Sequence, residues 1–223
     1  MINWGIAGVG KMGNIFSEAI KETSNAKLVL TASKSNKKIE TIESTNYENL
    51  IKNKNIDAIY ISTTNNLHSD LIFKSIENGK NVLCEKPMCT DLEKIMKIKD
   101  LSKNYNLQIF EAIAYYSHPQ TINLMDLINS NTIGKIEHIE CSFGFKTRVK
   151  PNSRLFDKKL GGGVILDLGC YPISFLMLFC NDYNLFKFTN KKIEICETDV
   201  ENYAEADLIL NKTIKAKIKI SFK

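Results

Sequence analysis

The stretch Ile2-Asn3-Trp4-Gly5-Ile6-Ala7-Gly8-Val9-Gly10-Lys11-Met12-Gly13 places the pattern Gly-x-Gly-x-x-Gly directly after a short apolar run. The run predicts a buried strand, and the apolar residues spaced along 15–20 predict an amphipathic helix behind the glycines. In this order the three glycines allow a tight turn, close approach of the backbone to a pyrophosphate, and close packing of helix on strand. The pyrophosphate then binds the N–H groups of the helix N-terminus. The stretch therefore predicts a dinucleotide-binding turn whose binding residues are Gly8, Gly10, Lys11, Met12 and Gly13.

The composition of the 223-residue chain is ordinary for a globular protein, with 43% hydrophobic and 25% charged residues. The net charge of +5 comes from scattered lysines, and short runs such as Lys37-Lys38 and Lys158-Lys159 are typical of solvated faces. We therefore expect no nucleic-acid partner. The sequence contains neither an apolar stretch long enough to span a bilayer nor the basic-then-apolar order of a signal peptide. These features predict a cytoplasmic protein without a membrane partner.

The six cysteines and three histidines do not have the spacing of a metal site. The cysteines show neither C-x-x-C spacing nor the density of a secreted disulfide scaffold, so we expect reduced and mostly buried thiols. His118 precedes Pro119, and we expect it to cap or orient the chain rather than to catalyse. The sequence predicts no bound metal.

Strand and helix signals alternate through the first half of the chain. Apolar runs predict strands at 28–32, 56–61, 81–84 and 107–114, and periodic apolar positions predict a helix over about 67–78. Thr90-Asp91-Leu92-Glu93 resembles a capping box, with Thr90 as the N-cap of a further helix. Strands separated by helices predict an α/β Rossmann domain with a doubly wound parallel sheet over residues 1–118. Its ligand should lie beyond the carboxyl ends of the strands.

The pattern changes after His118-Pro119. A helix is predicted over about 120–128 and an alternating strand over 139–145, and Gly161-Gly162-Gly163 precedes an apolar helix over about 167–180. Strands follow at 193–195, 203–210 and 214–222. Because these strands follow one another without crossover helices, they predict a second, α+β domain over 119–223 with a mostly antiparallel open sheet. The boundary rests on the change of pattern alone.

The end of the second predicted strand bears on the choice of cofactor. A fold that prefers NAD usually has an acidic residue about twenty residues after the glycines. This chain has Ser33-Lys34-Ser35 there, and a lysine flanked by hydroxyls suits a ribose 2′-phosphate. We therefore expect Ser33 and Lys34 to bind NADP(H) in preference to NAD(H), with use of both left open.

Two further segments carry side chains suited to carbonyl reduction. Lys86 follows a predicted strand and precedes Pro87, so it should point into the ligand crevice; on its own it is also typical of a surface Glu–Lys pair. Asp167 and Tyr171 are four residues apart and share one helix face if that helix begins by Asp167. A phenol beside an ammonium group can act as a general acid for a carbonyl. Taken alone, Tyr171 is equally typical of a packed core tyrosine.

Five motifs in chain order resemble those of the glucose–fructose oxidoreductase/inositol dehydrogenase (Gfo/Idh/MocA) superfamily. They are Gly8–Gly13, Ile61–His68, Gly79–Pro87, Glu111–Gln120 and Gly161–Pro172. Two positions depart from the usual pattern, since members commonly have proline in place of Thr64 and arginine in place of Tyr116. The resemblance covers nearly the whole chain.

The resemblance implies roles for individual residues. Lys86 corresponds to the catalytic lysine. Tyr171 is similar to the tyrosine of the dihydrodiol dehydrogenase and glucose–fructose oxidoreductase branch, where it donates and accepts the proton and the lysine lowers its pKa. Asp167 would orient the substrate or the lysine, and the loop 146–156, with Arg148 and Arg154, is expected to line the pocket. Cofactor contacts are implied for Thr63, Thr64, Asn65, His68, Glu85 and Lys86.

The implied reaction is hydride transfer between a nicotinamide and a secondary alcohol or ketone of a sugar, a polyol or a trans-dihydrodiol. Because family members continue with further strands beyond the point corresponding to Lys223, we expect this chain to be C-terminally truncated, with an unpaired sheet edge and an apolar face. A homo-oligomer through that sheet is one way to cover them. Two alternatives stay open: a nucleotide-binding relative without catalysis, and a reductase of another small substrate, such as biliverdin or a nucleotide sugar.

Overall fold

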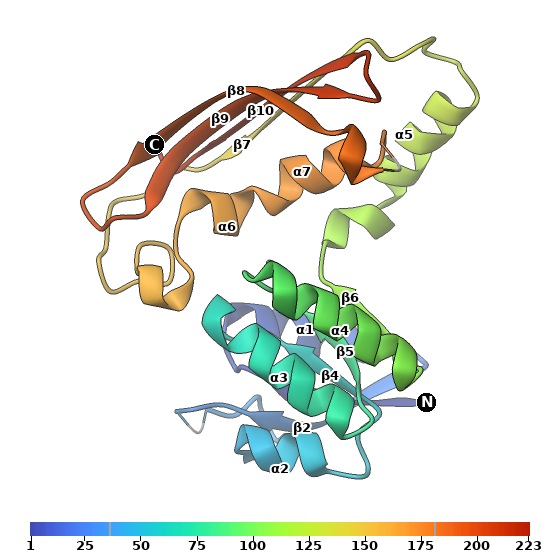
Figure 1. Ribbon diagram of the computed structural model, residues 1–223. Coiled ribbons are helices and arrows are strands. Elements are labelled where there is room, and N and C mark those ends of the chain that lie inside the picture. Colours follow the sequence, from blue (N-terminus) through green and yellow to red (C-terminus); the bar gives the residue numbers. More distant parts are fainter. Residues whose placement is uncertain (36, 181) are drawn as a thin grey trace. The chain divides into compact units, whose positions relative to one another are not determined.

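The chain forms two units in the computed structural model, Met1–Ala112 and Ile113–Lys223, and the structure describes residues 1–35, 37–180 and 182–223 (Figure 1). The sequence pattern had predicted the boundary at residue 118. The structure divides the chain earlier because the 3-10 helix η1 (Ala114–Ser117) bonds within the second unit, where the hydroxyls of Tyr115 and Tyr116 contact Ser174.

The first unit is built on a parallel sheet of six strands in the order β3-β2-β1-β4-β5-β6. This is the doubly wound order, in which the chain reverses its direction of winding between β1 and β4. The strands are β1 (Ile2–Ala7), β2 (Ala26–Ala32), β3 (Ser44–Thr45), β4 (Ala58–Ile61), β5 (Asn81–Cys84) and β6 (Ile109–Glu111), and the helices are α1 (Lys11–Lys21), α2 (Tyr47–Lys52), α3 (Asn65–Glu77) and α4 (Leu92–Asn104). Of these elements, β3 and α2 had no clear signal in the sequence.

Apolar side chains cover both faces of this sheet. The core on one face contains Ile59, Ile61 and Val82. The core on the opposite face contains Ile6 and Tyr60. All four residues of β4 are buried, which is why the strand appears in the sequence as an unbroken apolar run. The winding order predicted from the strand and helix signals is therefore confirmed.

The start of α4 differs from the prediction. Asp91, not Thr90, is the N-cap, and its carboxylate accepts hydrogen bonds from the backbone N–H groups of Glu93 and Lys94 at 2.9 and 3.1 Å. Asp91 has the extended backbone that an N-cap requires, and its negative charge also suits the positive end of the helix. The predicted capping box is therefore wrong by one residue.

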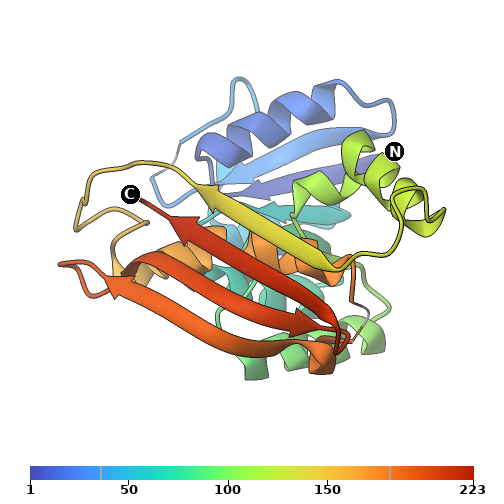
Figure 2. The ribbon, with the colours of Figure 1, turned by 90° about the horizontal axis from the view of Figure 1, so that it is seen from above.

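The second unit contains a four-stranded sheet in the order β7-β10-β9-β8 (Figure 2). The β8–β9 and β9–β10 pairs are antiparallel, whereas β7 runs parallel to β10, so the sheet is mixed and mostly antiparallel as predicted. The elements are α5 (Pro119–Asn129), β7 (His138–Gly144), η2 (Lys158–Leu160), α6 (Val164–Leu168), α7 (Cys170–Met177), η3 (Tyr183–Leu185), β8 (Lys187–Ile195), β9 (Glu201–Leu210) and β10 (Ile214–Ser221). His118 caps α5, where its Nδ1 accepts from the N–H of Gln120 at 3.1 Å.

The helix predicted over 167–180 is two helices. They meet at Gly169, where the axis from 158–168 to 170–177 bends by 44°. A Cβ at Gly169 would lie 2.4 Å from the carbonyl oxygen of Ile165, so this tight junction requires glycine. Asp167 therefore lies on α6 and Tyr171 on α7, and the prediction that they share one helix face is wrong.

The two faces of the second sheet differ in polarity. Leu208, Ile218 and Ile220 pack into the cores on the face covered by α6 and α7. On the other face, Lys217 pairs with Glu205 at 2.9 Å and Tyr203 donates to the same carboxylate. The face that carries Lys217 and Glu205 is therefore charged. Strict alternation of lysines with apolar residues along β10 produces this difference. Exposed apolar side chains also occur in this sheet, at Phe143 on β7 and at Phe188, Ile193 and Ile195 on β8, so the expected apolar surface stays a prediction.

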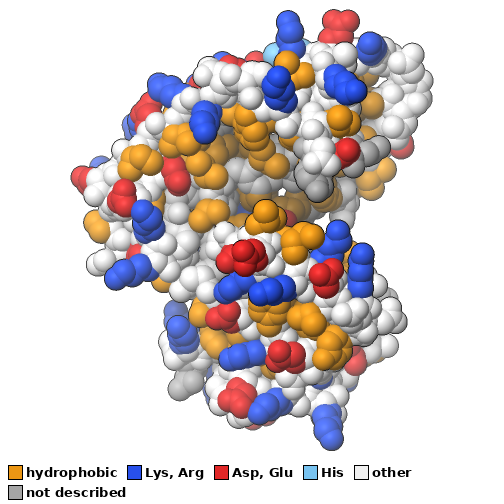
Figure 3. Space-filling model, in the orientation of Figure 1, with side chains coloured by type: hydrophobic (Ala, Val, Ile, Leu, Met, Phe, Trp, Pro, Cys, Tyr) orange, Lys and Arg blue, Asp and Glu red, His pale blue; other side chains and the backbone are white. Residues whose placement is uncertain are grey.

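Basic and acidic side chains are interspersed over the visible face of the first unit, without one continuous basic patch (Figure 3). Among the described residues, no group of His, Cys, Asp and Glu side chains could hold a metal ion. The six cysteines, all within the described part of the chain, are free thiols, and Cys84 and Cys180 are buried. Within the same residues, no single helix is long and apolar enough to cross a membrane, and only the bent pair 158–168 and 170–177 passes that test of length and composition.

Candidate active site

The glycine turn after β1 is held between two strands. The N–H of Gly8 donates to the carbonyl of Ala32, and the hydroxyl of Ser62 donates to the carbonyl of Gly8, both at 2.8 Å. Gly8 has φ +110°, and a Cβ there would lie 2.6 Å from the backbone of Ser62. A Cβ at Gly13 would lie 2.3 Å from the carbonyl oxygen of Gly8. Both positions therefore require glycine for backbone geometry and packing.

Gly10 has a different role, because a Cβ there would meet nothing within 4 Å. It is the N-cap of α1, provides no side-chain cap, and is followed by a first turn without acidic residues. The N-terminus of this 11-residue helix thus combines open space beside the backbone with N–H donors and no competing negative charge. These residues fit the pyrophosphate of a dinucleotide.

In the loop after β2, Lys34 is exposed on the surface and Ser33 is buried beneath the loop. The Ser33 hydroxyl accepts from the N–H of Lys37 at 2.8 Å, and it lies 3.3 Å from the Lys37 carbonyl. Ser44 donates to that carbonyl at 3.0 Å. Ser33 is 9% exposed, so in this conformation its hydroxyl organises the turn. Sequence reasoning had treated Ser33 as a phosphate ligand and missed this internal partner, which only the folded loop brings close.

His68, at the start of α3, connects the loops that follow β4 and β5. Its Nδ1 lies 2.9 Å from the carbonyl oxygen of Pro87 and its Nε2 lies 3.2 Å from that of Thr63. The side chain is fully buried. A neutral imidazole donates from one nitrogen only, so the tautomer decides which carbonyl receives the hydrogen bond. These contacts account for a histidine here as a link between two loops, and direct contact with a cofactor stays a prediction.

The turn that carries Lys86 is held in place by acidic side chains. Glu85 accepts a hydrogen bond from the hydroxyl of Tyr60 at 2.5 Å through Oε1, and the N–H of Lys86 lies 3.3 Å from its Oε2. Glu111 accepts from the N–H of Met88 at 2.7 Å. Burial, together with the bond to Glu85, raises the pKa of Tyr60. Tyr60 was hidden within an apolar run, so the sequence offered no signal for this contact.

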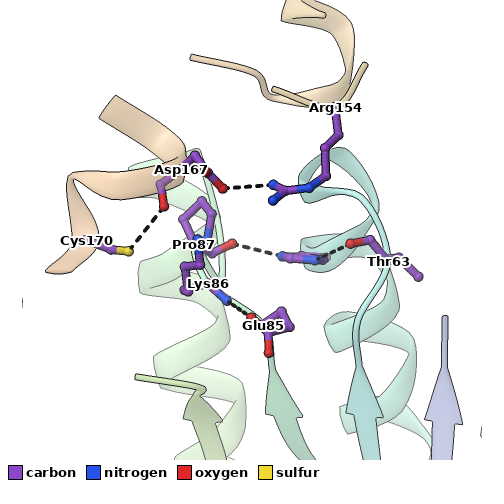
Figure 4. A network of polar contacts seen from close by, with 8 residues as sticks. Thr63, Glu85, Lys86, Pro87, Arg154, Asp167 and Cys170 are labelled. Carbon is purple, nitrogen blue, oxygen red and sulfur yellow. Dashed lines mark hydrogen bonds and ion pairs between the residues drawn. The ribbon is translucent and has the colours of Figure 1, made fainter. Parts of the chain in front are cut away.

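In the second unit, the side chain of Asp167 is buried and forms an ion pair with Arg154. Arg154 Nη1 lies 2.8 Å from Asp167 Oδ1, and the two side chains are 56% and 6% exposed (Figure 4). The thiol of Cys170 contacts the carbonyl of Asp167 at 3.9 Å. Asp167 therefore orients a guanidinium whose side chain is more than half exposed. From the sequence, Arg154 was expected only to line the pocket as part of the loop 146–156, and its contact with Asp167 was not predicted.

Tyr171, at the beginning of α7, borders a shallow, open cavity of about 540 Å³ in the second unit. Its ring packs against Phe143 with a centroid distance of 4.8 Å, and Tyr115, Cys141 and Phe175 also line the cavity. The walls are mainly aromatic and apolar. Such walls suit the apolar face of a ring, as in many small-molecule sites.

Two family models match the chain in succession. Residues 2–113 match the oxidoreductase family with an NAD-binding Rossmann fold, and residues 122–223 match the GFO/IDH/MocA C-terminal domain. The chain belongs to the Gfo/Idh/MocA family. The family resemblance inferred from the five motifs is thus confirmed, and the first unit is the NAD-binding Rossmann domain of this family.

Several curated relatives in the Gfo/Idh/MocA family are dehydrogenases or reductases. A trans-1,2-dihydrobenzene-1,2-diol dehydrogenase from Xenopus tropicalis is 29% identical over 188 residues, covering 80% of this chain and 56% of the relative. A dTDP-3,4-didehydro-2,6-dideoxy-α-D-glucose 3-reductase from Actinomadura kijaniata is 30% identical over 133 residues, covering 60% of this chain and 40% of the relative. The chain therefore spans about half the length of the curated relatives it matches.

Solved structures share the fold over nearly the whole chain. A 3-ketoreductase from Actinomadura kijaniata, in complex with NADP and TDP-benzene, superposes with a TM-score of 0.87 at 23% identity, covering 99% of this chain and 70% of the other. An NAD-binding protein from Listeria innocua has a TM-score of 0.86 at 20% identity, covering 99% and 66%. At these identities the likeness establishes the fold.

Proposed function

We propose that this protein is an NAD(P)-dependent oxidoreductase acting on a secondary alcohol or ketone of a sugar, a polyol or a trans-dihydrodiol. The observation that carries the proposal is the open Gly10 turn at the N-terminus of α1, within a chain that belongs to an oxidoreductase family. The nicotinamide supplies the hydride chemistry when bound. The protein binds and orients the cofactor and the substrate, and its side chains move the proton.

The proposed cofactor residues come from loops at the carboxyl ends of four strands. Gly8, Gly10 and Gly13, with the N–H groups of Lys11 and Met12, would hold the pyrophosphate after β1. The remaining proposed contacts, after β2, β4 and β5, are Ser33, Lys34, Thr63, Thr64, Asn65, His68, Glu85 and Lys86. The contacts of Ser33 and His68 within the protein argue that these two act by shaping their loops.

The proposed proton donor in the direction of reduction is the phenol of Tyr171, which would protonate the carbonyl oxygen and leave a phenolate. The ammonium group of Lys86 would stabilise that phenolate by its charge. Asp167 would act through Arg154, whose exposed guanidinium suits hydroxyl or anionic groups of the substrate. In the direction of oxidation the same tyrosine would accept the proton.

A preference for NADP(H) over NAD(H) is proposed from the loop after β2. Residues 33–38 contain three lysines and no carboxylate, and Lys34, Lys37 and Lys38 are exposed. A 2′-phosphate would gain from these charges, whereas an NAD ribose would lack its usual acidic partner. A D-xylose 1-dehydrogenase (NADP(+)) from Haloferax volcanii, 29% identical over 69% of this chain, supports the proposal.

A second candidate is reduction of a keto group on a nucleotide-linked sugar. The 30% identity to the dTDP-sugar 3-reductase over 133 residues favours it. Solved structures of the ketoreductase from the same organism include variants with a tyrosine changed to phenylalanine and with a lysine changed to alanine or glutamate. Those variants support a tyrosine and a lysine as the first residues to test in this chain.

The first experiment is a titration of the purified chain with NADPH and NADH, following nicotinamide fluorescence and the melting temperature together. We expect tighter binding of NADPH and a higher melting temperature at saturation. A panel of aldoses, polyols, trans-dihydrodiols and dTDP-keto sugars would then identify the substrate class. Lys86→Ala and Tyr171→Phe should each reduce turnover strongly while leaving NADPH-induced stabilisation measurable.

Two results would contradict the proposal. Full turnover by Lys86→Ala on a substrate that the parent accepts would remove the lysine from the mechanism. Tight NADPH binding without turnover of any panel substrate would favour a nucleotide-binding relative without catalysis.

A further inference from the structure

Two adjacent tyrosines on η1 contact the same residue of α7. The hydroxyl of Tyr115 lies 2.8 Å from the hydroxyl of Ser174, and the hydroxyl of Tyr116 donates to the backbone carbonyl of Ser174 at 2.8 Å. Their rings pack together with a centroid distance of 4.9 Å. We call these three residues the tyrosine clamp.

The hydrogen bonds of the clamp link Tyr115, Ser174 and Tyr171. Ser174 donates its single hydroxyl proton to the carbonyl of Tyr171 at 3.0 Å. Either hydroxyl could donate in the contact between Tyr115 and Ser174, and Tyr115 is the donor when Ser174 donates to Tyr171. Burial raises the pKa of Tyr115, which keeps the phenol protonated as this arrangement requires. The relay runs from Tyr115 through Ser174 to the backbone of Tyr171.

Tyr116 satisfies a carbonyl that the helix leaves open. The last four carbonyls of a helix have no partner in the next turn, and Ser174 is the first of these four in α7. Leu178, whose N–H would bond to Ser174 in a longer helix, donates instead to Phe175 at 3.1 Å. The Tyr116 hydroxyl takes the vacant position.

We infer that Tyr115 and Tyr116 are positioning residues for Tyr171. Helix α7 has eight residues and begins after the bend at Gly169, so two turns of helix alone do not fix the direction of its first residues. The clamp attaches this helix, one turn beyond Tyr171, to the segment that opens the second unit.

Hydrogen exchange tests the clamp without any substrate. In Tyr116→Phe and Ser174→Ala we expect the amides of residues 174–178 to exchange roughly tenfold faster than in the parent, with the amides of α3 unchanged. Ser174→Thr keeps the hydroxyl and should restore the parent rates. Tyr105→Phe removes the hydroxyl of an exposed tyrosine of the first unit and is the matched control. Unchanged exchange in Tyr116→Phe and Ser174→Ala would overturn the inference.

The kinetic part of the test rests on the proposed function. With a substrate that the parent turns over, Tyr115→Phe and Tyr116→Phe should lower kcat roughly tenfold to a hundredfold, because a misplaced proton donor loses alignment. The KM for NADPH should stay unchanged, since the proposed cofactor contacts lie in the first unit. Faster exchange of α7 without any loss of kcat would overturn the positioning role. If the parent protein turns over no substrate, the proposed function is overturned. The hydrogen-exchange rates then still test whether the tyrosine clamp holds α7.

Discussion

The hydroxyl of Tyr60 lies 2.5 Å from the Oε1 atom of Glu85, 25 residues further along the chain. Tyr60 is 2% exposed, and its ring stacks on Phe16 with a centroid distance of 4.0 Å. The other carboxylate oxygen of Glu85 faces the N–H of Lys86. A rigid phenol within the core of the sheet thus anchors the acid beside the proposed catalytic lysine.

This contact predicts a change in alkaline stability. Burial and the bond to Glu85 raise the pKa of Tyr60, so above pH 10 the unfolded state releases a proton that the folded state retains. The free energy of unfolding should then fall by about 1.4 kcal/mol per pH unit from this group. Tyr60→Phe should lose that part of the slope and, at pH 7, about 1–3 kcal/mol of stability, because Glu85 loses a donor. Urea unfolding at pH 7, 10 and 11 measures both; equal alkaline slopes would contradict the prediction.

The glycine turn predicts opposite outcomes for two similar substitutions. Gly10→Ala should fold with an almost unchanged melting temperature because its Cβ meets nothing within 4 Å, yet it should weaken NADPH binding about tenfold or more by blocking the approach of the pyrophosphate. Gly13→Ala should cost about 1–3 kcal/mol, since its Cβ would lie 2.3 Å from a backbone oxygen. Thermal unfolding and fluorescence titration distinguish them. Unaltered NADPH affinity in a folded Gly10→Ala protein would remove Gly10 from the proposed site.

The preference for NADP(H) depends on charge at the end of β2. Lys34→Ala should raise the Kd for NADPH about tenfold, equivalent to one charge-assisted hydrogen bond, and should leave the Kd for NADH nearly unchanged. Lys27→Ala, an exposed lysine near the opposite end of the same strand, is the control of equal charge. The Kd values should be compared at low and moderate salt, where screening reduces any non-specific effect. Equal loss of affinity for both cofactors would contradict a contact with the 2′-phosphate.

Burial predicts which thiols react in the folded protein. Burial raises the pKa of Cys84 well above its ordinary value, whereas Cys89 is partly exposed on the loop before α4. Labelling with a chromogenic disulfide at pH 8 should therefore modify Cys89 early and Cys84 only on unfolding, because the thiolate is the reacting form. The fast amplitude should fall by one thiol in Cys89→Ala and stay unchanged in Cys84→Ala. A reduced fast amplitude in Cys84→Ala would show that this thiol is accessible.

Much of the first unit could be predicted because its signals are local. The strand–glycine–helix order at Gly8–Gly13 and the apolar runs at 56–61 and 81–84 predict a doubly wound sheet, and the sheet has that winding. Predictions for single side chains were less accurate. Asp91 caps α4 in place of Thr90, and Ser33 bonds to Lys37 within its own loop. In both cases neighbouring polar side chains could have made the same kind of contact, and the backbone conformation decides which of them does.

By itself the sequence determined most of the strands and helices, their order, and which strand ends carry polar side chains, because apolar periodicity and glycine positions act over a few neighbouring residues. The short elements β3 and α2 and the break between α6 and α7 are the exceptions. Only the tertiary structure decided which of those side chains meet. Tyr60 with Glu85, His68 with Pro87, and Tyr116 with Ser174 come together through strand order, register and a bend at Gly169. Contacts between residues far apart in the chain depend on packing, which local pattern does not specify.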